Sequence, residues 1–128
     1  YSRCLSHGEA AASQLAVFEF VNSALNCIFL LNNIYMPYYK WSFRALGNLS
    51  VLSSLSQPLE YLISSGNTHS EAIAKSETIE RICSDIISEL TKQNLSDFSG
   101  LSAEGHAYSV NNKITDSQIR NFHILFAV

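Results

Sequence analysis

The stretch EAAASQLAVFEFVNSALNCIFLLNNIYMP, residues 9–37, decides the fold. No glycine or proline interrupts it before its last residue, and apolar side chains recur along it at helical spacing. Other apolar residues, Val17 and Phe20 among them, fill the remaining sides of the same helix. A helix that is apolar around most of its circumference is typical of the centre of a bundle. We therefore expect one long central helix over residues 8–35, ended by Pro37.

The rest of the chain predicts further helices. Pro37 is also suited to open a short helix over residues 38–46, and a second short helix is expected over residues 58–63. Residues 101–112 have a weaker helical pattern, and Thr115 or Asp116 would cap a last helix. The apolar residues of that last helix are Ile119, Phe122 and Phe126.

Residues 68–93 carry the clearest amphipathic pattern, with Thr68 or Ser70 as the expected helix cap. The predicted buried side of this helix consists of Ile73, Ile79, Ile82, Cys83, Ile86 and Leu90. The charged residues are expected on its exposed side: Glu71, Lys75, Glu77, Glu80, Arg81, Asp85, Glu89 and Lys92.

Composition agrees with a helical domain. Of the 128 residues 47% are apolar and 15% charged, which excludes a disordered chain and suits a single core. Five glycines and two prolines are too few for an all-β fold with many hairpins. The prediction is an all-α, elongated bundle of four to six helices that forms one domain over residues 1–128. Because the chain starts at Tyr1 rather than Met, we expect it to be a piece of a longer protein.

Charge and cysteine content exclude several classes of protein. Eight lysines and arginines and a net charge of −3 do not supply the basic stripe of a module that binds duplex nucleic acid. Polar residues interrupt the longest apolar stretch, so we expect no membrane span. Cys4, Cys27 and Cys83 form no disulfide framework, which favours free thiols and a cytoplasmic location. Cys4 and His7 lack a second pair of ligands, so no metal site is expected.

One segment combines aromatic rings with positive charge. Residues 32–44 hold three tyrosines, the only tryptophan, Lys40 and Arg44 around a proline. On a helix Lys40 and Arg44 share a face and are placed to contact phosphate groups, while Tyr38 and Trp41 offer stacking surfaces. Free N–H groups at the start of the helix would add to an anion site. The same aromatic residues would equally suit a packed corner of the core.

A polar stripe on the long helix is a second candidate. It consists of Glu19, Asn22, Ser23, Asn26 and Asn33, spaced three or four residues apart for most of its length. Glu19 and Asn26 would line a cleft if the stripe leads to the aromatic segment, with Glu19 as a general base or an orienting group. The alternative is that the stripe is the solvated side of the helix.

The chain resembles a family of unknown function, domain of unknown function 4037. The resemblance rests on Arg3-Cys4-Leu5 with Gly8-Glu9, on LNNIYMPYYKW over residues 31–41, on Ile82-Cys83 and on Ile119-Arg120. It implies a helical C-terminal domain similar to the substrate-binding domains of nucleotidyltransferases, which follows a nucleotidyltransferase-like domain in cis. It also implies that this chain binds a nucleotide or another small molecule and is not catalytic alone.

By that resemblance Lys40 and Arg44 are assigned to phosphate, and Tyr38 and Trp41 to a base or acceptor, with Glu19 and Asn26 as weaker candidates. This piece would bind no cofactor itself, whereas the whole protein would use ATP with Mg²⁺. The alternative is a non-enzymatic interaction module that docks a protein through the aromatic segment or forms a homodimer.

Overall fold

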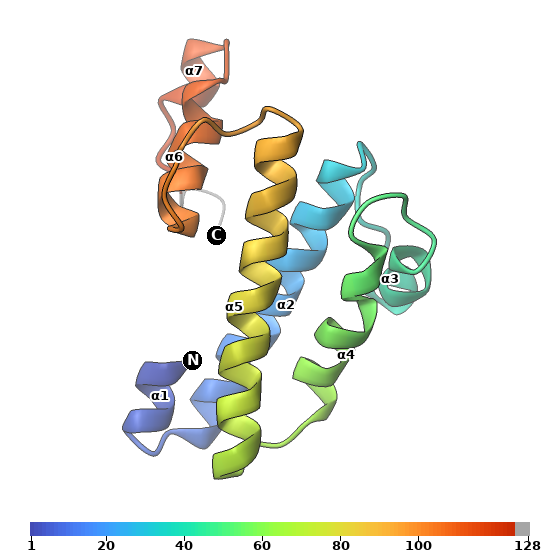
Figure 1. The fold of residues 1–128 in the computed structure, drawn as a ribbon, viewed down its shortest axis with the longest axis vertical. Helices are drawn as coiled ribbons and strands as arrows, with labels where there is room; N and C mark the ends of the chain where they lie inside the picture. Colours follow the sequence, from blue (N-terminus) through green and yellow to red (C-terminus); the bar gives the residue numbers. More distant parts are fainter. Residues whose placement is uncertain (125–128) are drawn as a thin grey trace. The chain divides into compact units, whose positions relative to one another are not determined.

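The computed structural model describes residues 1–124, and every regular element in that range is helical (Figure 1). The predicted all-α class is therefore confirmed, with more helices than the expected four to six. The α-helices are α1 (Ser2–Ser6), α2 (Ala10–Leu31), α3 (Tyr39–Leu46), α4 (Ser56–Ser64), α5 (His69–Lys92), α6 (Ala103–Asn112) and α7 (Ser117–Arg120), and a 3₁₀ turn, η1, spans Ser53–Leu55.

The chain divides into two compact units, Tyr1–Ile82 and Cys83–Val128, and the boundary falls within α5. In the first unit α2 packs against α1, α3 and α4, which confirms its predicted central place (Figure 1). Its buried residues include Val17, Val21, Ile28 and Phe29. The helix is not enclosed on all sides, however, because Leu15 is 63% exposed.

By length and composition α2 resembles a membrane-spanning helix, with 22 residues and a mean hydropathy of 1.5. It is the one such helix among the described residues. A central helix of a bundle has the same properties, and here Val17 and Ile28 are fully buried within the chain itself.

Helix α2 ends earlier than predicted. Asn33, which follows the C-cap residue Asn32, adopts the left-handed conformation with φ of 57°. The Asn33 N–H donates to the carbonyl of Leu30, and the Ile34 N–H donates to the carbonyl of Phe29 at 3.1 Å. These two bonds form a Schellman motif, which stops a helix without proline. The predicted end at residue 35 was wrong because asparagine tolerates this conformation and takes the place that glycine usually holds.

The early end of α2 leaves residues 32–38 outside any helix, so Pro37 does not open α3 as predicted. Asn32 ties this connection to the loop that follows α3. Its side-chain amide donates to the Val51 carbonyl and accepts from the Val51 N–H, both at 3.0 Å. These two bonds from one side chain to the Val51 backbone fix the path of the chain on both sides of α3.

Helix α5 differs most from its predicted amphipathic pattern. Lys75, which was expected on the exposed side, is 0% exposed, and Ile73, expected on the buried side, is 51% exposed. Ile82 is buried as predicted. The prediction assigned each residue to a face by its own hydropathy. It was wrong for Lys75 because this lysine is buried among polar groups.

Lys75 is the centre of a buried polar cluster in the first unit. Its ammonium donates to the side-chain oxygen of Gln14 at 3.0 Å, the backbone carbonyl of Ser65 at 2.9 Å and the side-chain oxygen of Asn67 at 3.2 Å. Asn67 in turn donates to Gln14 and accepts from the Tyr1 hydroxyl. All three ammonium protons thus have neutral acceptors, while burial lowers the pKa of Lys75.

Glu71 stabilises the start of α5. Its carboxylate accepts the Thr68 hydroxyl at 2.6 Å, the Thr68 N–H at 2.9 Å and the Gly66 N–H at 3.2 Å. These hydrogen bonds, the Thr68 hydroxyl first, hold the pKa of Glu71 below its ordinary value of 4.5. The bond from the Thr68 N–H to Glu71 is one half of a capping box, and Thr68 is one of the two residues predicted to cap this helix.

The second unit contains the end of α5 and the two last helices. Asn94 has φ of 57° and ends α5 with the same hydrogen-bond pattern as Asn33 does for α2. Asp116 caps α7, as one of the two predicted residues, by accepting the N–H groups of Gln118 and Ile119. Phe122 lies beyond α7, and Phe126 of the predicted last helix lies outside the described residues.

Two substitutions of Lys75 distinguish how much its charge and how much its packing contribute to the free energy of unfolding. Lys75→Met keeps most of the side-chain volume but leaves the Ser65 carbonyl without its donor, so we expect a loss of about 1–3 kcal/mol in unfolding free energy. Lys75→Glu places a carboxylate against three oxygen atoms and should cost about 4 kcal/mol or more. Urea denaturation measures both, with the exposed Lys92→Met as control. Equal stability of Lys75→Glu and Lys92→Met would contradict the cluster.

Glu71 predicts a dependence of stability on pH. Because its folded pKa is lowered, its contribution is fully present above the unfolded value of 4.5 and is lost as the pH falls through the folded pKa. The stability difference between the wild type and Glu71→Gln should therefore shrink between pH 7 and pH 3. Urea denaturation at both pH values checks this, and a constant difference would show that the ionised carboxylate does not matter.

Candidate functional site

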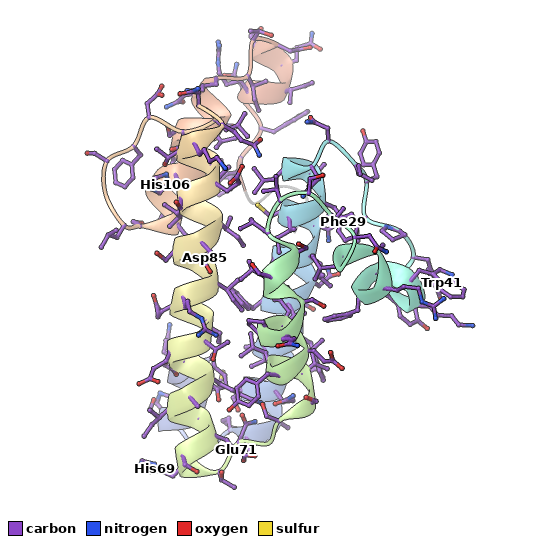
Figure 2. The ribbon with its side chains drawn as sticks, turned by 45° about the vertical axis from the view of Figure 1, so that its right-hand side comes forward. Phe29, Trp41, His69, Glu71, Asp85 and His106 are labelled. Carbon is purple, nitrogen blue, oxygen red and sulfur yellow. The ribbon has the colours of Figure 1, made fainter. Side chains whose placement is uncertain are left out.

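The predicted aromatic and cationic residues lie on the exposed side of α3. Ser42 and Leu46 are buried on its inner side. At about 100° per residue, Lys40, Trp41 and Arg44 fall within one arc on the opposite side. In Figure 2 the Trp41 side chain points away from the bundle, whereas Phe29 of α2 lies inside it. The expectation of a packed aromatic corner is therefore wrong for Trp41, which is 46% exposed.

Trp41 brings the two cations together. The Lys40 ammonium lies 5.3 Å from the centroid of the indole ring, and the guanidinium carbon of Arg44 lies 5.1 Å from it. Both distances are within the range of a cation–π interaction. In the described part of the chain neither cation has a carboxylate partner. The two positive charges are therefore held close to one ring and are not neutralised by the chain itself.

Two tyrosines continue this surface at the start of α3. The rings of Tyr38 and Tyr39 are 4.3 Å apart at an interplanar angle of 47°, and the residues are 65% and 71% exposed. A side-chain hydrogen bond with Tyr39 raises the pKa of Tyr38. We call the residues Tyr38, Tyr39, Lys40, Trp41 and Arg44 the α3 patch.

The first turn of α3 is open to an acceptor. Tyr38 occupies the N-cap position, and no side chain caps the helix. Within residues 1–124 the N–H groups of Tyr39 and Lys40 donate to no protein acceptor. Free N–H groups at a helix start favour anions, so the helix and the two side chains attract the same kind of ligand.

Glu19 and Asn26 are not brought into the α3 patch by any interaction. Both are exposed on α2. The Asn26 amide donates to the carbonyl of Asn22, one turn earlier in the same helix, at 2.9 Å. In the range that the structure describes, Glu19 has no hydrogen bond or ion pair. The two residues form part of the solvated side of α2, which was the alternative interpretation of the polar stripe.

The second unit contains a buried serine–histidine pair that was not predicted from the sequence. His106, on α6, is 2% exposed, as is Ser96 in the loop after α5. Ser96 Oγ lies 2.7 Å from His106 Nδ1, and His106 Nε2 lies 2.9 Å from the Gly100 carbonyl. A carbonyl only accepts, so Nε2 carries the proton and the Ser96 hydroxyl donates to Nδ1. The spacing of ten residues has no helical period, so periodicity does not reveal the pair.

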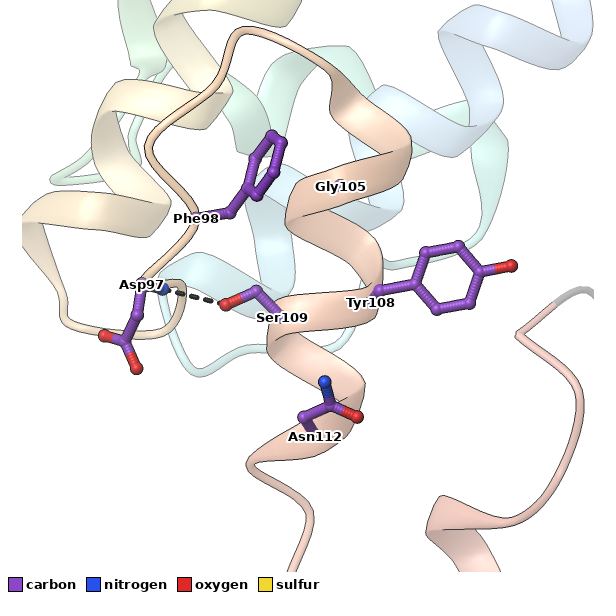
Figure 3. A pocket seen from close by; sticks show the side chains of 6 residues that line it. All are labelled: Asp97, Phe98, Gly105, Tyr108, Ser109 and Asn112. Atoms are coloured by element: carbon purple, nitrogen blue, oxygen red, sulfur yellow. Dashed lines mark hydrogen bonds between the residues drawn. The ribbon is translucent and has the colours of Figure 1, made fainter.

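The Phe98 ring covers this pair. It meets His106 edge-on, with ring centroids 5.2 Å apart. A Cβ at Gly100 or Gly105 would collide with the far end of the Phe98 ring, so a larger residue at either position would displace that ring. Figure 3 shows the shallow pocket beside it and the hydrogen bond from the Asp97 N–H to Ser109 Oγ. The pair thus holds residues 96–100 against α6 and is shielded from solvent.

Ser96→Ala tests this role in stability. The substitution leaves His106 Nδ1 without a donor and the Phe98 N–H without its acceptor, which should cost about 1–3 kcal/mol. Ser99→Ala, in the same loop but exposed, is the matched control and should change stability by less than about 0.5 kcal/mol. Amide hydrogen exchange of residues 96–106 measures the effect, and equal protection in the two variants would contradict it.

The described residues offer no group of three or more histidine, cysteine or acidic side chains that would hold a metal ion. The three cysteines are free thiols, and burial raises the pKa of Cys27. The α3 patch supports the binding of an anion beside aromatic rings, because two cations lie against the Trp41 ring.

Comparison with known families gives one partial match. Residues 1–42 match the model of a family described as a domain of unknown function (DUF4037). The match covers 42 of the 128 residues, from α1 into α3, and includes Tyr38, Lys40 and Trp41 but not Arg44. Comparison with curated proteins gave no match. Comparison with solved structures gave none either.

Proposed function

We propose that this chain is an accessory ligand-binding module of a nucleotidyltransferase-like protein, and that the α3 patch binds a nucleotide or another phosphate-bearing ligand. The observation that carries the proposal is the position of Lys40 and Arg44, both about 5 Å from the Trp41 ring and both without a carboxylate partner in the described residues. The proposed module is cytoplasmic and not catalytic alone.

The phosphates and the base of a nucleotide each have a counterpart in the patch. The phosphate groups would contact the Lys40 ammonium, the Arg44 guanidinium and the free N–H groups at the start of α3. Because both cations already lie against Trp41, the base is better placed on the exposed Tyr38–Tyr39 pair than on the indole. In this proposal the Trp41 ring does not stack on the base as first expected. It holds the Lys40 and Arg44 cations in position instead.

The groups needed for catalysis would lie in another domain of the proposed parent protein. A nucleotidyltransferase-like domain in cis would supply the catalytic carboxylates and bind ATP with Mg²⁺. Resemblance alone leads to that domain, and the partial family match does not extend to it. The alternative function is a protein-interaction or dimerisation module, which the exposed aromatic residues also favour.

Nucleotide titration tests the proposal. Trp41 is the only tryptophan, so its fluorescence reports directly on the patch. ATP, with and without Mg²⁺, should bind the 128-residue chain weakly, and Lys40→Ala and Arg44→Ala should each weaken binding about tenfold by removing a charge-assisted contact. Lys92→Ala removes the same charge from α5 and should have no effect.

Unchanged ATP affinity in both Lys40→Ala and Arg44→Ala would exclude the α3 patch as the site. The interaction module makes a different prediction, namely that the chain self-associates with rising concentration and that Trp41→Ser reduces the association. Light scattering distinguishes the two functions.

A further inference from the structure

The α3 patch and the segment before it expose more aromatic surface than one nucleotide needs. Tyr35 is 88% exposed, Tyr38 65%, Tyr39 71% and Trp41 46%. One base stacks on one or two rings, so a mononucleotide at the Tyr38–Tyr39 pair would leave the Tyr35 ring uncovered. Exposed aromatic side chains at such density are typical of a binding surface.

The order of rings and charges along the chain also favours a binding surface. Tyr35 lies in the non-helical segment before α3, whereas both cations lie on α3 itself. No acidic residue occurs between Glu19 and Glu60, so the surface near the rings carries no repulsive carboxylate from its own segment. Rings along a segment with cations beside them are the features by which proteins bind single strands.

The backbone before α3 is also free to contact a ligand. Within residues 1–124 the N–H groups of Tyr35, Met36 and Tyr38 donate to no protein acceptor, and Pro37 has none to offer. A mononucleotide with its phosphates at Lys40 and Arg44 would use only part of this row of donors. A ligand with several phosphates and several bases matches both the donors and the rings.

We infer that Tyr35 and the α3 patch bind a single-stranded oligonucleotide, with successive bases on Tyr35 and the Tyr38–Tyr39 pair and phosphates at Lys40 and Arg44. The inference rests on the proposed function, which supplies the first nucleotide. Duplex nucleic acid does not fit, because its bases are paired and stacked inside and the chain has no basic stripe.

Binding of a fluorescein-labelled tetrauridylate, measured by anisotropy and compared with UMP as competitor, tests the inference on the 128-residue chain. The tetranucleotide should bind at least about tenfold more tightly than UMP, since each further stacked base adds to affinity. With two phosphates neutralised, the logarithm of the binding constant should fall with the logarithm of salt concentration with a slope of about −1.4. Lys40→Ala should reduce that slope to about −0.7.

Tyr35→Ala is the decisive variant. It should weaken tetranucleotide binding about tenfold or more and leave UMP binding unchanged, because Tyr35 lies outside the mononucleotide contacts. Tyr108→Ala, an exposed tyrosine of α6, is the matched control and should alter neither. Circular dichroism confirms that each variant is folded.

The outcomes separate this inference from the proposed function. If UMP and the tetranucleotide bind equally well, or if Tyr35→Ala weakens neither, the oligonucleotide is excluded and the mononucleotide site stands. If neither binds, the oligonucleotide is excluded, and the ATP titration decides the proposed function separately. Binding of a duplex as tight as that of the single strand would also overturn the inference.

Discussion

The left-handed turn at Asn33 determines where the functional surface lies. Because this turn stops α2 at Leu31, the segment up to Tyr38 leaves the bundle and α3 begins as a separate helix. Had α2 continued to residue 35, Tyr35 would belong to the central helix rather than to an exposed segment. The two hydrogen bonds between Asn32 and Val51 then fix the loop after α3 to the end of α2. The position of the α3 patch thus follows from local backbone geometry.

One side of α3 packs against the rest of the first unit, and the opposite side carries the residues proposed to bind a ligand. Ser42 and Leu46 bury one side of this short helix, so the opposite side must face solvent. Trp41 would be costly there as an isolated apolar residue. Contact with Lys40 and Arg44 covers part of the indole, and the long aliphatic stems of both cations suit this arrangement. The same contact limits the freedom of the two charged groups, so less entropy is lost when an anion binds.

Much of the fold follows from the sequence, because apolar periodicity and capping residues act locally. The central α2, the short α3 and the long α5 lie close to their predicted ranges, and Asp116 caps α7 as expected. Lys75 was misplaced because its burial depends on partners that the helical period of α5 does not reveal: Gln14 lies 61 residues away, and Ser65 and Asn67 lie in the loop before the helix. The Ser96–His106 pair escaped for the same reason.

The candidate site was predicted in part. Lys40, Trp41 and Arg44 share a face because helical spacing alone places them together. Glu19 and Asn26 belong to another helix, and periodicity could not show that they make no interaction with the α3 patch. The single-domain organisation over residues 1–128 stays a prediction, since two compact units lie within it.

The central claim is that Trp41 sits beneath two positive charges that are open to an anion. Quenching of its fluorescence by iodide tests this most directly, with neutral acrylamide as the reference for exposure. We expect iodide to quench the wild type markedly more than the Lys40→Ala/Arg44→Ala double variant, while acrylamide quenches both to a similar extent. Equal iodide quenching of the two proteins would contradict the account.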